Sequence, residues 1–398
     1  MIFEFEDSAA RNARMKVIGV GGAGGNAVNR MIDEDLEGVE FVSINTDAQA
    51  LRNSQSHMKI QIGKQLTRGL GAGARPEIGR QAIAENQDEV RQALEHADLV
   101  FITAGMGGGT GTGAAPVIGQ MAREQGSLCV AIVTRPFRFE GKRRMRHAEV
   151  GLQELRAAVD TMIVVPNERL LSICVEGTSF RDALKKADEV LLHATQGISD
   201  LISVTGEVNV DFADVRTVMG NRGAALMGTG ESSGENRAVD AAQQAICSPL
   251  LEDVSINGAT GVLVNITGGT DLAIDEVTTI NSIVQEAAGD DVELIFGAVH
   301  DPELDETLRV TVIATGFGEA PEELLFEPTD DVIPFRLNGP SLVAEPAPAE
   351  VTTGLAADFG VPEFELGGVG AIGVDPILLA GDGLDDLEIP TFIRRQMD

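Results

Sequence analysis

The sequence contains neither tryptophan nor tyrosine, and it has only three cysteines, five histidines and six lysines. Phenylalanine is its one large aromatic side chain, which leaves few platforms on which nucleic-acid bases could stack. The formal net charge of −32 would also repel nucleic-acid phosphates, whose attraction to Lys and Arg dominates such binding. These shortages exclude a nucleic-acid-binding protein.

The cysteines and histidines are also too scattered to build a covalent framework or a metal centre. Cys129, Cys174 and Cys247 form neither a disulfide framework nor a Cys-x-x-Cys pair. The histidines include no pair at the four-residue spacing that places two ligands on one helical face. We therefore expect no metal site built from protein side chains alone.

Long hydrophobic runs are missing too. No stretch approaches ~18 apolar residues, and the acidic start, MIFEFEDSAARNARM, lacks the apolar run of a secretory signal. We therefore expect a cytoplasmic protein that does not insert into a membrane. The low lysine content and the 62 acidic residues suit a cytoplasm of very high salt, where the Debye length shrinks to ~3 Å at 1 M. We expect a halophilic host, in which K⁺ is a candidate cofactor.

What the sequence does contain is an alternation of short apolar runs with helical patterns. Its 398 residues, 43% of them hydrophobic, suffice for two or three globular domains. Nearly continuous apolar runs predict parallel strands covered on both faces, at residues 15–20, 40–45, 98–105, 128–134 and 161–166. Between them, residues 76–96 and 114–125 are helix-like. The alternation predicts a doubly wound α/β domain over residues 15–180, after an N-terminal extension of residues 1–14.

A second, smaller domain follows a long helix. Apolar residues at helical spacing from Arg181 to about Ile202 predict one amphipathic helix, so residues 181–208 hold this helix and the start of the next loop. Residues 209–318 have the pattern of an α+β domain, with helices and strands predicted at 212–219, 237–247, 259–267, 292–300 and 309–317. The expected fold is a doubly wound domain joined by a long central helix to a smaller α+β domain.

The composition changes after Gly318. Residues 319–398 hold nine of the 15 prolines and 17 acidic residues against three arginines. This enrichment is typical of a disordered acidic linker, which we expect over residues 319–383. Residues 384–398 differ, because apolar and cationic side chains gather there: Ile389, Pro390, Phe392, Ile393, Arg394 and Arg395. A frayed terminus is one interpretation. We favour a partner-binding peptide, because these apolar groups have no core to join.

Two glycine-rich turns follow predicted strands. The first, residues 19–26, precedes a helix predicted near residue 27, and glycines there would let a polyphosphate approach the backbone and the free N–H groups of the helix start. Gly19, Gly21 and Gly24 satisfy G-x-G-x-x-G. Asp47 lies about where an NAD-binding acid would, so a dinucleotide-binding oxidoreductase is an alternative. A tight strand-to-helix turn is the purely structural interpretation.

The second turn, residues 105–113, reads GMGGGTGTG. The five glycines and two threonines of residues 106–113 suit a backbone nest with hydroxyls around anionic oxygens. Neither turn has the Gly-Lys-Ser/Thr of a P-loop, which excludes a Walker-type site. Helix dipoles, backbone amides and Mg²⁺ would then neutralise a triphosphate lying across the carboxyl edge of the sheet.

These motifs make the sequence resemble the tubulin/FtsZ family of self-assembling cell-division GTPases over nearly its whole length. Both glycine-rich turns match, as GGAGGNAVN (21–29) and GMGGGTGTG (105–113). Further matches are NTDAQAL (45–51), GLGAGARPEIG (69–79), RPFRFEGKRRM (135–145), VPNERLL (165–171), NVDFADV (209–215), RVTVIATGF (309–317) and IPTFIRRQ (389–396). The resemblance implies a Rossmann-like GTPase domain at residues 15–180, with GTP or GDP as ligand.

The resemblance also implies a set of GTP-binding residues. They are Gly21, Gly22, Ala23, Gly24, Gly25, Asn26, Gly107, Gly108, Gly109, Thr110 and Gly111 around the phosphates, Ala72 and Gly73 near the γ-phosphate, Glu140 and Arg144 at the ribose and phosphates, and Asn167, Leu184 and Asp188 at the base. Taken alone, the spacing of Glu140 and Arg144 predicts an ordinary helical ion pair. Asp188 alone would be a polar position on an amphipathic helix.

Two positions depart from the family pattern. Leu184 stands where the family commonly has a Phe stacked on the base, so contact with the base there would be apolar. Arg75 stands where the family commonly has an Asn before a Pro, and its guanidinium could touch the γ-phosphate or pair with an acid. Neither departure removes a catalytic group.

The segment 209–215 carries the expected catalytic residues. On its own it predicts an Asx turn and a helix N-cap. The resemblance implies instead a loop that enters the nucleotide pocket of the next subunit, where Asp211 and Asp214 align a water and accept its proton and Asn209 orients the loop. Each chain would then carry half a site at each end, and head-to-tail stacking would propagate a filament.

The resulting hypothesis is a self-polymerising GTPase that scaffolds a division ring at mid-cell, on the inner face of the membrane. The terminal peptide would bind a membrane-anchored adaptor such as SepF, and a second family paralogue is a further candidate partner. The basic patch, Arg135, Arg138, Lys142, Arg143, Arg144 and Arg146, is assigned to nucleotide and filament contacts. Besides the oxidoreductase, a non-hydrolysing structural or regulatory paralogue is an alternative.

Overall fold

The computed structural model describes residues 13–173, 179–203, 208, 210–220, 223–251, 256–301, 304 and 306–317. All of them belong to one compact unit of the chain. The expected linker (319–383), the expected partner-binding peptide (384–398) and Asn209 lie outside these residues.

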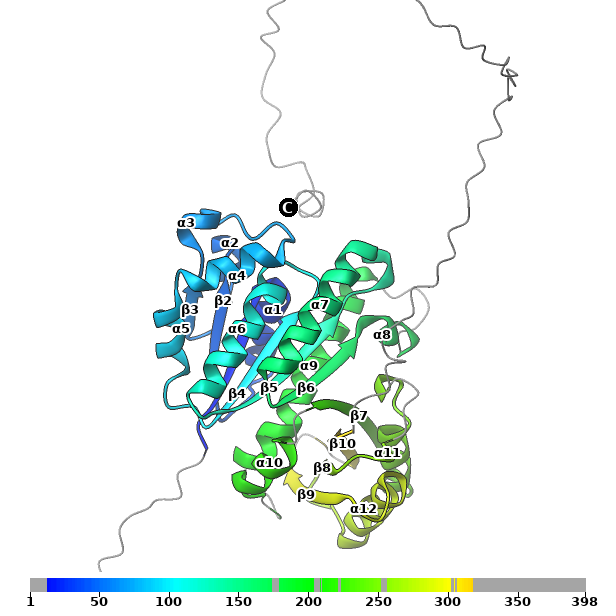
Figure 1. Ribbon diagram of the computed structural model, residues 1–398. Coiled ribbons are helices and arrows are strands. Elements are labelled where there is room, and N and C mark those ends of the chain that lie inside the picture. The colour runs from blue at the N-terminus through cyan, green and yellow to red at the C-terminus, as the bar shows by residue number, and fades with distance from the viewer. Residues whose placement is uncertain are drawn as a thin grey trace, which may run out of the picture. The chain divides into compact units, whose positions relative to one another are not determined.

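The described strands form one ten-stranded sheet in the order β3-β2-β1-β4-β5-β6-β7-β10-β8-β9 (Figure 1). They are β1 (Met15–Val20), β2 (Val39–Asn45), β3 (Met58–Gln61), β4 (Leu99–Gly105), β5 (Leu128–Arg135), β6 (Thr161–Pro166), β7 (Gly223–Ser233), β8 (Gly261–Gly268), β9 (Glu293–His300) and β10 (Thr307–Thr315). The first seven in sheet order pair in parallel, whereas β10 is antiparallel to β7 and β8. The order reverses between β1 and β4, the switch point at which doubly wound sheets bind ligands.

Helices cover both faces of this sheet. They are α1 (Gly21–Asp33), α2 (Ala48–Arg52), α3 (Lys64–Thr67), α4 (Pro76–Ala84), α5 (Gln87–Leu94), α6 (Thr110–Glu124), η1 (Arg138–Glu140), α7 (Lys142–Ala158), α8 (Asn167–Ile173), α9 (Phe180–Ser203), α10 (Phe212–Met219), α11 (Arg237–Ile246), η2 (Pro249–Leu251) and α12 (Ile274–Ala288). Neighbouring residues of a strand face opposite sides, so Val17 of β1 packs with α1 and α9, and Ile18 packs with α4 to α7.

The long helix α9 packs against both parts of the sheet, the parallel strands β1 to β6 and the mixed strands β7 to β10. Its buried side chains share one core with Phe101 of β4 and with Leu263 and Ile313 of β8 and β10. On the other face of the second part, α11 and α12 pack against β8 and β10. A parallel domain, a long helix and a smaller mixed domain therefore follow one another along the chain, as the sequence predicts.

The structure also corrects the predicted elements. Residues 76–96 form two helices and not one: α4 ends at Ala84, and the side chain of Asn86 in the break accepts a hydrogen bond from the N–H of Gly63 at 3.1 Å. β7 was not predicted, because glycine and alanine make up much of it. A Cβ on its Gly228 would lie 1.9 Å from the carbonyl oxygen of Ala245, so these small residues let α11 pack closely on the strand.

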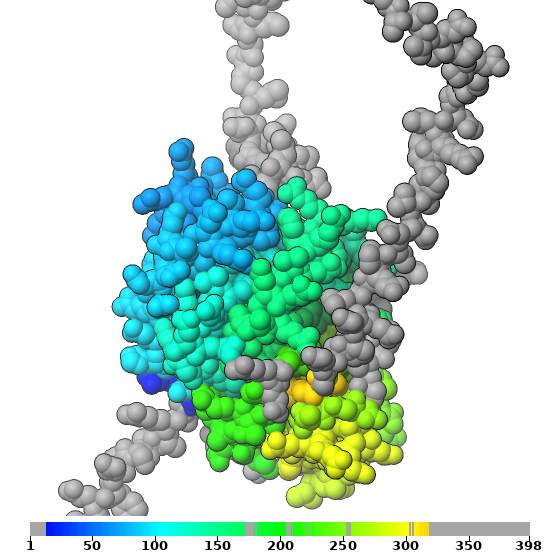
Figure 2. All heavy atoms as spheres, viewed as in Figure 1, coloured from blue at the N-terminus to red at the C-terminus, as the bar shows by residue number. Residues whose placement is uncertain are grey.

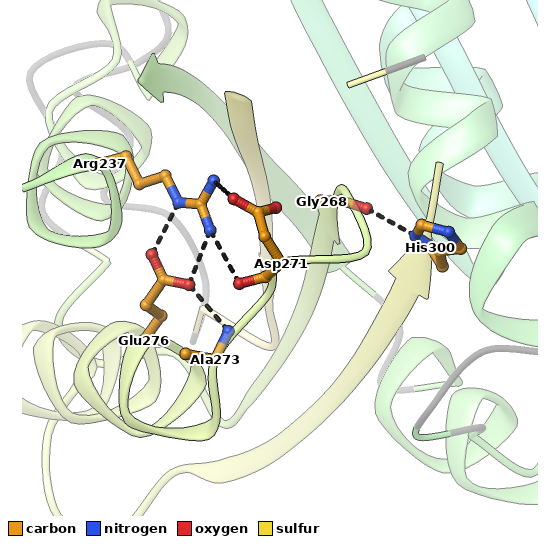
Figure 3. A network of polar contacts seen from close by, with 6 residues as sticks. All are labelled: Arg237, Gly268, Asp271, Ala273, Glu276 and His300. Carbon is orange, nitrogen blue, oxygen red and sulfur yellow. Dashed lines mark hydrogen bonds and ion pairs between the residues drawn. The ribbon is translucent and has the colours of Figure 1, made fainter. Parts of the chain in front are cut away.

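A buried arginine fixes the start of α12 (Figure 3). Arg237 is 6% exposed, and it donates from Nε to Glu276 Oε1 and from Nη1 to Asp271 Oδ2, both at 2.7 Å. Glu276 Oε2 also accepts from the N–H of Ala273 at 2.9 Å. Hydrogen bonding to the guanidinium lowers the pKa of both carboxyl groups. The network ties α11 to the loop that precedes α12.

Candidate functional site

The first glycine-rich turn joins β1 directly to α1. β1 ends at Val20 and α1 begins at Gly21, so the predicted helix start near residue 27 is wrong. Gly21 has φ +75°, a conformation that residues with a side chain rarely adopt. A Cβ on Gly24 would lie 2.3 Å from the carbonyl oxygen of Thr103 in β4. Gly24 therefore allows α1 to pack on the sheet.

Two other glycines of this turn have no such packing role. A Cβ on Gly22 or Gly25 would meet no atom within 4 Å, although alanine is favoured over glycine by about 1 kcal/mol inside a helix. Ala23 and Asn26 beside them are exposed. The first turn of α1 has no acidic residue, and its N-cap, Val20, supplies no side-chain hydrogen bond. Free N–H groups beside open space suit an anion that approaches the backbone closely.

The second glycine-rich turn is built in the same way and touches the first. It leads from β4 into α6, which begins at Thr110, earlier than the predicted start at residue 114. Gly107 has φ +92°, and its N–H donates to Thr112 Oγ1 at 2.8 Å. A Cβ on Gly21 would lie 3.0 Å from the nitrogen of Gly111, so the amino ends of α1 and α6 converge. Their dipoles therefore add at one point of the sheet edge.

The segment before α4 packs on this second turn. A Cβ on Gly109 would lie 2.7 Å from the Cβ of Ala72, which is buried. Gly73 is exposed, and the nearest atoms to a Cβ there belong to the Arg75 guanidinium, at 3.9 Å. Gly108 is open, since its nearest neighbour to such a Cβ is also 3.9 Å away. The structure thus brings Ala72, Gly73 and Arg75 to the turn.

Glu140 and Arg144 also lie beside the second turn. Arg144 Nη1 is 3.0 Å from Glu140 Oε2, so the two residues form an ion pair; it is not the pair within one helix that their spacing predicts, because Glu140 ends η1 and Arg144 lies in α7. Glu140 additionally accepts from the N–H of Phe137 at 2.8 Å, which fixes its carboxylate. A Cβ on Gly107 would lie 2.7 Å from the carbonyl oxygen of Arg144. The pair is therefore both an ordinary ion pair and a neighbour of the glycine-rich turn.

Asn167 and Asp188 place polar side-chain groups where burial disfavours them. Asn167 begins α8 directly after β6 and is 6% exposed, and its Oδ1 has no hydrogen-bond partner among the described residues. Burial raises the pKa of Asp188 in α9 to about 7, although the nearby charge of Arg30 in α1 lowers it. A buried acceptor without a donor costs free energy, so Asn167 suits a ligand that brings an N–H donor, while the surroundings of Asp188 disfavour its charged form. Leu184, one turn before Asp188, is 39% exposed.

Asp47, on which the oxidoreductase alternative depends, already has partners. Its Oδ1 accepts from the N–H groups of Gln49 at 2.7 Å and Ala50 at 3.2 Å, which caps α2. A ribose hydroxyl would have to compete with this cap. The preceding residue, Thr46, was not expected to belong to the site, but its hydroxyl lies 2.6 Å from that of Thr110. The signal for it was a threonine directly after a strand on the same sheet edge as both turns.

The helix α10, which carries the expected catalytic carboxylates, lies below the parallel strands in Figure 1, and its green atoms lie at the lower edge of the molecule in Figure 2. Asp211 is the N-cap of α10, where its side chain makes no capping bond, and Asp214 lies in the first turn; both are exposed. Arg216 of α10 donates to the carbonyl oxygen of Gly126, just past the end of α6, at 3.2 Å. α6 has 15 residues and so is about 22 Å long, and its opposite end carries the second turn. One chain therefore does not bring these carboxylates to its own turns.

The described residues offer no resident metal site. No group of three or more His, Cys, Asp or Glu side chains among them could hold a metal ion. The first turns of α1 and α6 lack acidic side chains. This donor set fits a Mg²⁺ ion that arrives with phosphate oxygens and water as ligands. In the same part of the chain, no helix is both long and apolar enough to span a bilayer.

Two family models match the chain. One, for the GTPase domain of the Tubulin/FtsZ family, covers residues 14–175, and the other, for the C-terminal domain of the FtsZ family, covers residues 223–318. The chain belongs to the tubulin/FtsZ family. Members of this family bind GTP or GDP and are GTPases, and both glycine-rich turns fall inside the matched GTPase domain. The resemblance and the fold class that the sequence predicts are therefore confirmed.

Solved structures agree with this assignment. The FtsZ dimer of M. jannaschii is 47% identical, with a TM-score of 0.74, over 76% of this chain and 88% of that one. The GDP-bound CetZ1 monomer of Haloferax volcanii is 22% identical, with a TM-score of 0.68, over 77% and 96% of the two chains. CetZ1 shares the fold, whereas the similarity to FtsZ extends to the sequence.

Proposed function

We propose that this tubulin/FtsZ-family protein hydrolyses GTP at a site that forms only between two subunits stacked head to tail. One observation carries the proposal: Asp211 and Asp214 lie near the carboxyl end of α6, whereas the glycine-rich turns lie at its amino end. A second subunit whose α10 end meets the turns of the first would supply both carboxylates. Such a contact is heterologous and repeats into a filament.

GTP in this proposal lies across the carboxyl edge of β1 and β4. The open backbone at Gly22, Gly25 and Gly108 receives the phosphates, which carry Mg²⁺ with them. Asn167 Oδ1 and the Asp188 carboxylate accept from the guanine edge, which distinguishes guanine from adenine because adenine presents no ring N–H there. The capped state of Asp47 disfavours the oxidoreductase alternative.

The cellular role is proposed from the family. The related structures include an FtsZ dimer and a CetZ2 protofilament bound to GTPγS, which support self-association of this chain as well. We propose a cytoplasmic filament at the mid-cell division ring of a halophilic archaeon, with K⁺ as a candidate cofactor. Residues 384–398, tethered by residues 319–383, would bind a membrane-anchored adaptor such as SepF, and a second paralogue could join the filament.

The first test is GTP turnover per subunit against protein concentration, in ~1 M KCl with Mg²⁺. A sharp rise above a threshold concentration is expected, because the site is complete only at a subunit contact. Constant turnover per subunit would mean that one chain holds a complete site. No turnover with tight GTP binding would favour the non-hydrolysing paralogue.

A mixing experiment tests the placement of the carboxylates. Gly25→Leu fills open space with a side chain that blocks the phosphates, and the double variant Asp211→Asn/Asp214→Asn removes the carboxylates. Each alone is expected to be inactive. An equal mixture should recover about a quarter of the wild-type rate. With random pairing, about one contact in four joins an intact nucleotide pocket of the Asp211→Asn/Asp214→Asn variant to the intact carboxylates of the Gly25→Leu variant. A mixture that stays inactive would contradict catalysis across the contact.

A further inference from the structure

A buried pair of hydroxyls ties the second glycine-rich turn to the end of β2. Thr46 Oγ1 and Thr110 Oγ1 lie 2.6 Å apart, with Thr46 fully buried and Thr110 8% exposed. Thr110 is the first residue of α6, and its Cβ lies 3.4 Å from a Cβ placed on Gly21. The hydroxyl of Thr110 therefore stands where the two turns meet, while that of Thr46 lies behind it, away from solvent.

The backbone around Thr46 is fixed on both sides. Its carbonyl oxygen accepts from Thr67 Oγ1 at 3.3 Å, and the next residue, Asp47, caps α2. The N–H of Asp47 in turn donates to Asn45 Oδ1 at 3.1 Å. Thr46 is thus held by bonds that do not involve its hydroxyl, and the hydroxyl itself contacts Thr110 as its only hydrogen-bond partner in the described part of the chain.

A threonine hydroxyl has one proton to donate and two lone pairs to accept with. When Thr46 donates to Thr110, the proton of Thr110 is left for an acceptor in front of it. A phosphate oxygen accepts and does not donate, so a bound phosphate selects this direction of the pair.

We propose that Thr46 is a positioning residue for the nucleotide site: it orients the hydroxyl of Thr110 so that this hydroxyl donates to a phosphate of the bound nucleotide. The inference rests on the proposed function, since it needs a phosphate at the two turns. It assigns a role to a residue that never touches the ligand.

The test is a double-mutant cycle on the full chain, measuring kcat and KM for GTP. Thr46→Val keeps the shape of the side chain and removes the hydroxyl. We expect a loss of kcat/KM of about 5- to 10-fold, the worth of one hydrogen bond, and recovery with Thr46→Ser. In a Thr110→Val background, the same change should have no further effect, because nothing is left to orient.

Thr195→Val is the matched control. Thr195 is also fully buried, and its hydroxyl donates to the carbonyl oxygen of Leu191 within α9 at 2.9 Å. It should shift the urea midpoint as Thr46→Val does and leave kcat/KM unchanged. Unchanged kinetics in Thr46→Val, or equal losses with and without the Thr110 hydroxyl, would overturn the inference alone. A wild-type chain that neither binds nor hydrolyses GTP would overturn the proposed function together with it.

Discussion

Alanine at Gly25 is expected to strengthen the fold and to weaken nucleotide binding. Gly25 lies within α1, and a Cβ there meets no atom within 4 Å, so the added methyl group causes no clash in the free protein. Replacing a helical glycine with alanine lowers the entropy of the unfolded chain and stabilises by about 0.5–1 kcal/mol. The same methyl group fills the space into which we place the phosphates. We expect GTP binding to weaken at least about tenfold, or ~1.4 kcal/mol.

The prediction is specific because stability should rise while affinity for GTP falls. A variant that is simply misfolded would lose both stability and affinity. The free energy of unfolding is measured by urea denaturation without nucleotide, and affinity by titration with a fluorescent GTP analogue. Gly24→Ala is the control: its Cβ would lie 2.3 Å from the carbonyl oxygen of Thr103, so it should lose about 1–3 kcal/mol of stability. Gly25→Ala with wild-type affinity for GTP would refute the reasoning, since the open glycines would then serve no ligand.

Two further changes test other parts of the structure. Because burial raises the pKa of Asp188 to about 7, GTP affinity should fall as the pH drops below that value, where the carboxyl group gains a proton and stops accepting. In Asp188→Asn, GTP affinity should no longer change between about pH 5.5 and 8. A wild-type affinity that is constant over this range would contradict the role of Asp188. Arg237→Met removes the buried guanidinium from Glu276, whose side chain is 19% exposed, and should cost about 1.5–3 kcal/mol in urea unfolding. Arg309→Met breaks a more exposed pair with Glu231 and should cost less than about 1 kcal/mol, so equal losses would argue against the importance of burial.

Local patterns predicted the elements that position the site, and the structure added what depends on contacts distant in sequence. Sequence patterns predict β1, β4 and the glycine-rich turns correctly. A buried parallel strand and a glycine-rich helix start each have a characteristic pattern within about ten residues. Asn167 and Asp188 were reached only through the family resemblance. The bond between Thr46 and Thr110 joins the end of β2 to the start of α6, and these segments meet only in the folded protein.

The missed elements have similar causes. β7 has glycine where most strands have branched residues, because α11 packs against its backbone. The separation of Asp211 from the turns follows from the direction of α6, which no motif records. Sequence patterns therefore gave the parts of the site, and the topology showed that one chain does not assemble them.

The place of α9 has a consequence for how the chain unfolds. The helix lies between the two matched family regions and belongs to neither, yet its apolar side chains complete the core on one face of both. β6 and β7, which join the two parts of the sheet, are paired over only three residues. The core that α9 completes on both parts therefore adds to the coupling between them. The two regions are matched separately in sequence comparison, yet we expect them to unfold as one cooperative unit. A fragment cut on either side of α9 would expose an apolar surface that it has no means to cover.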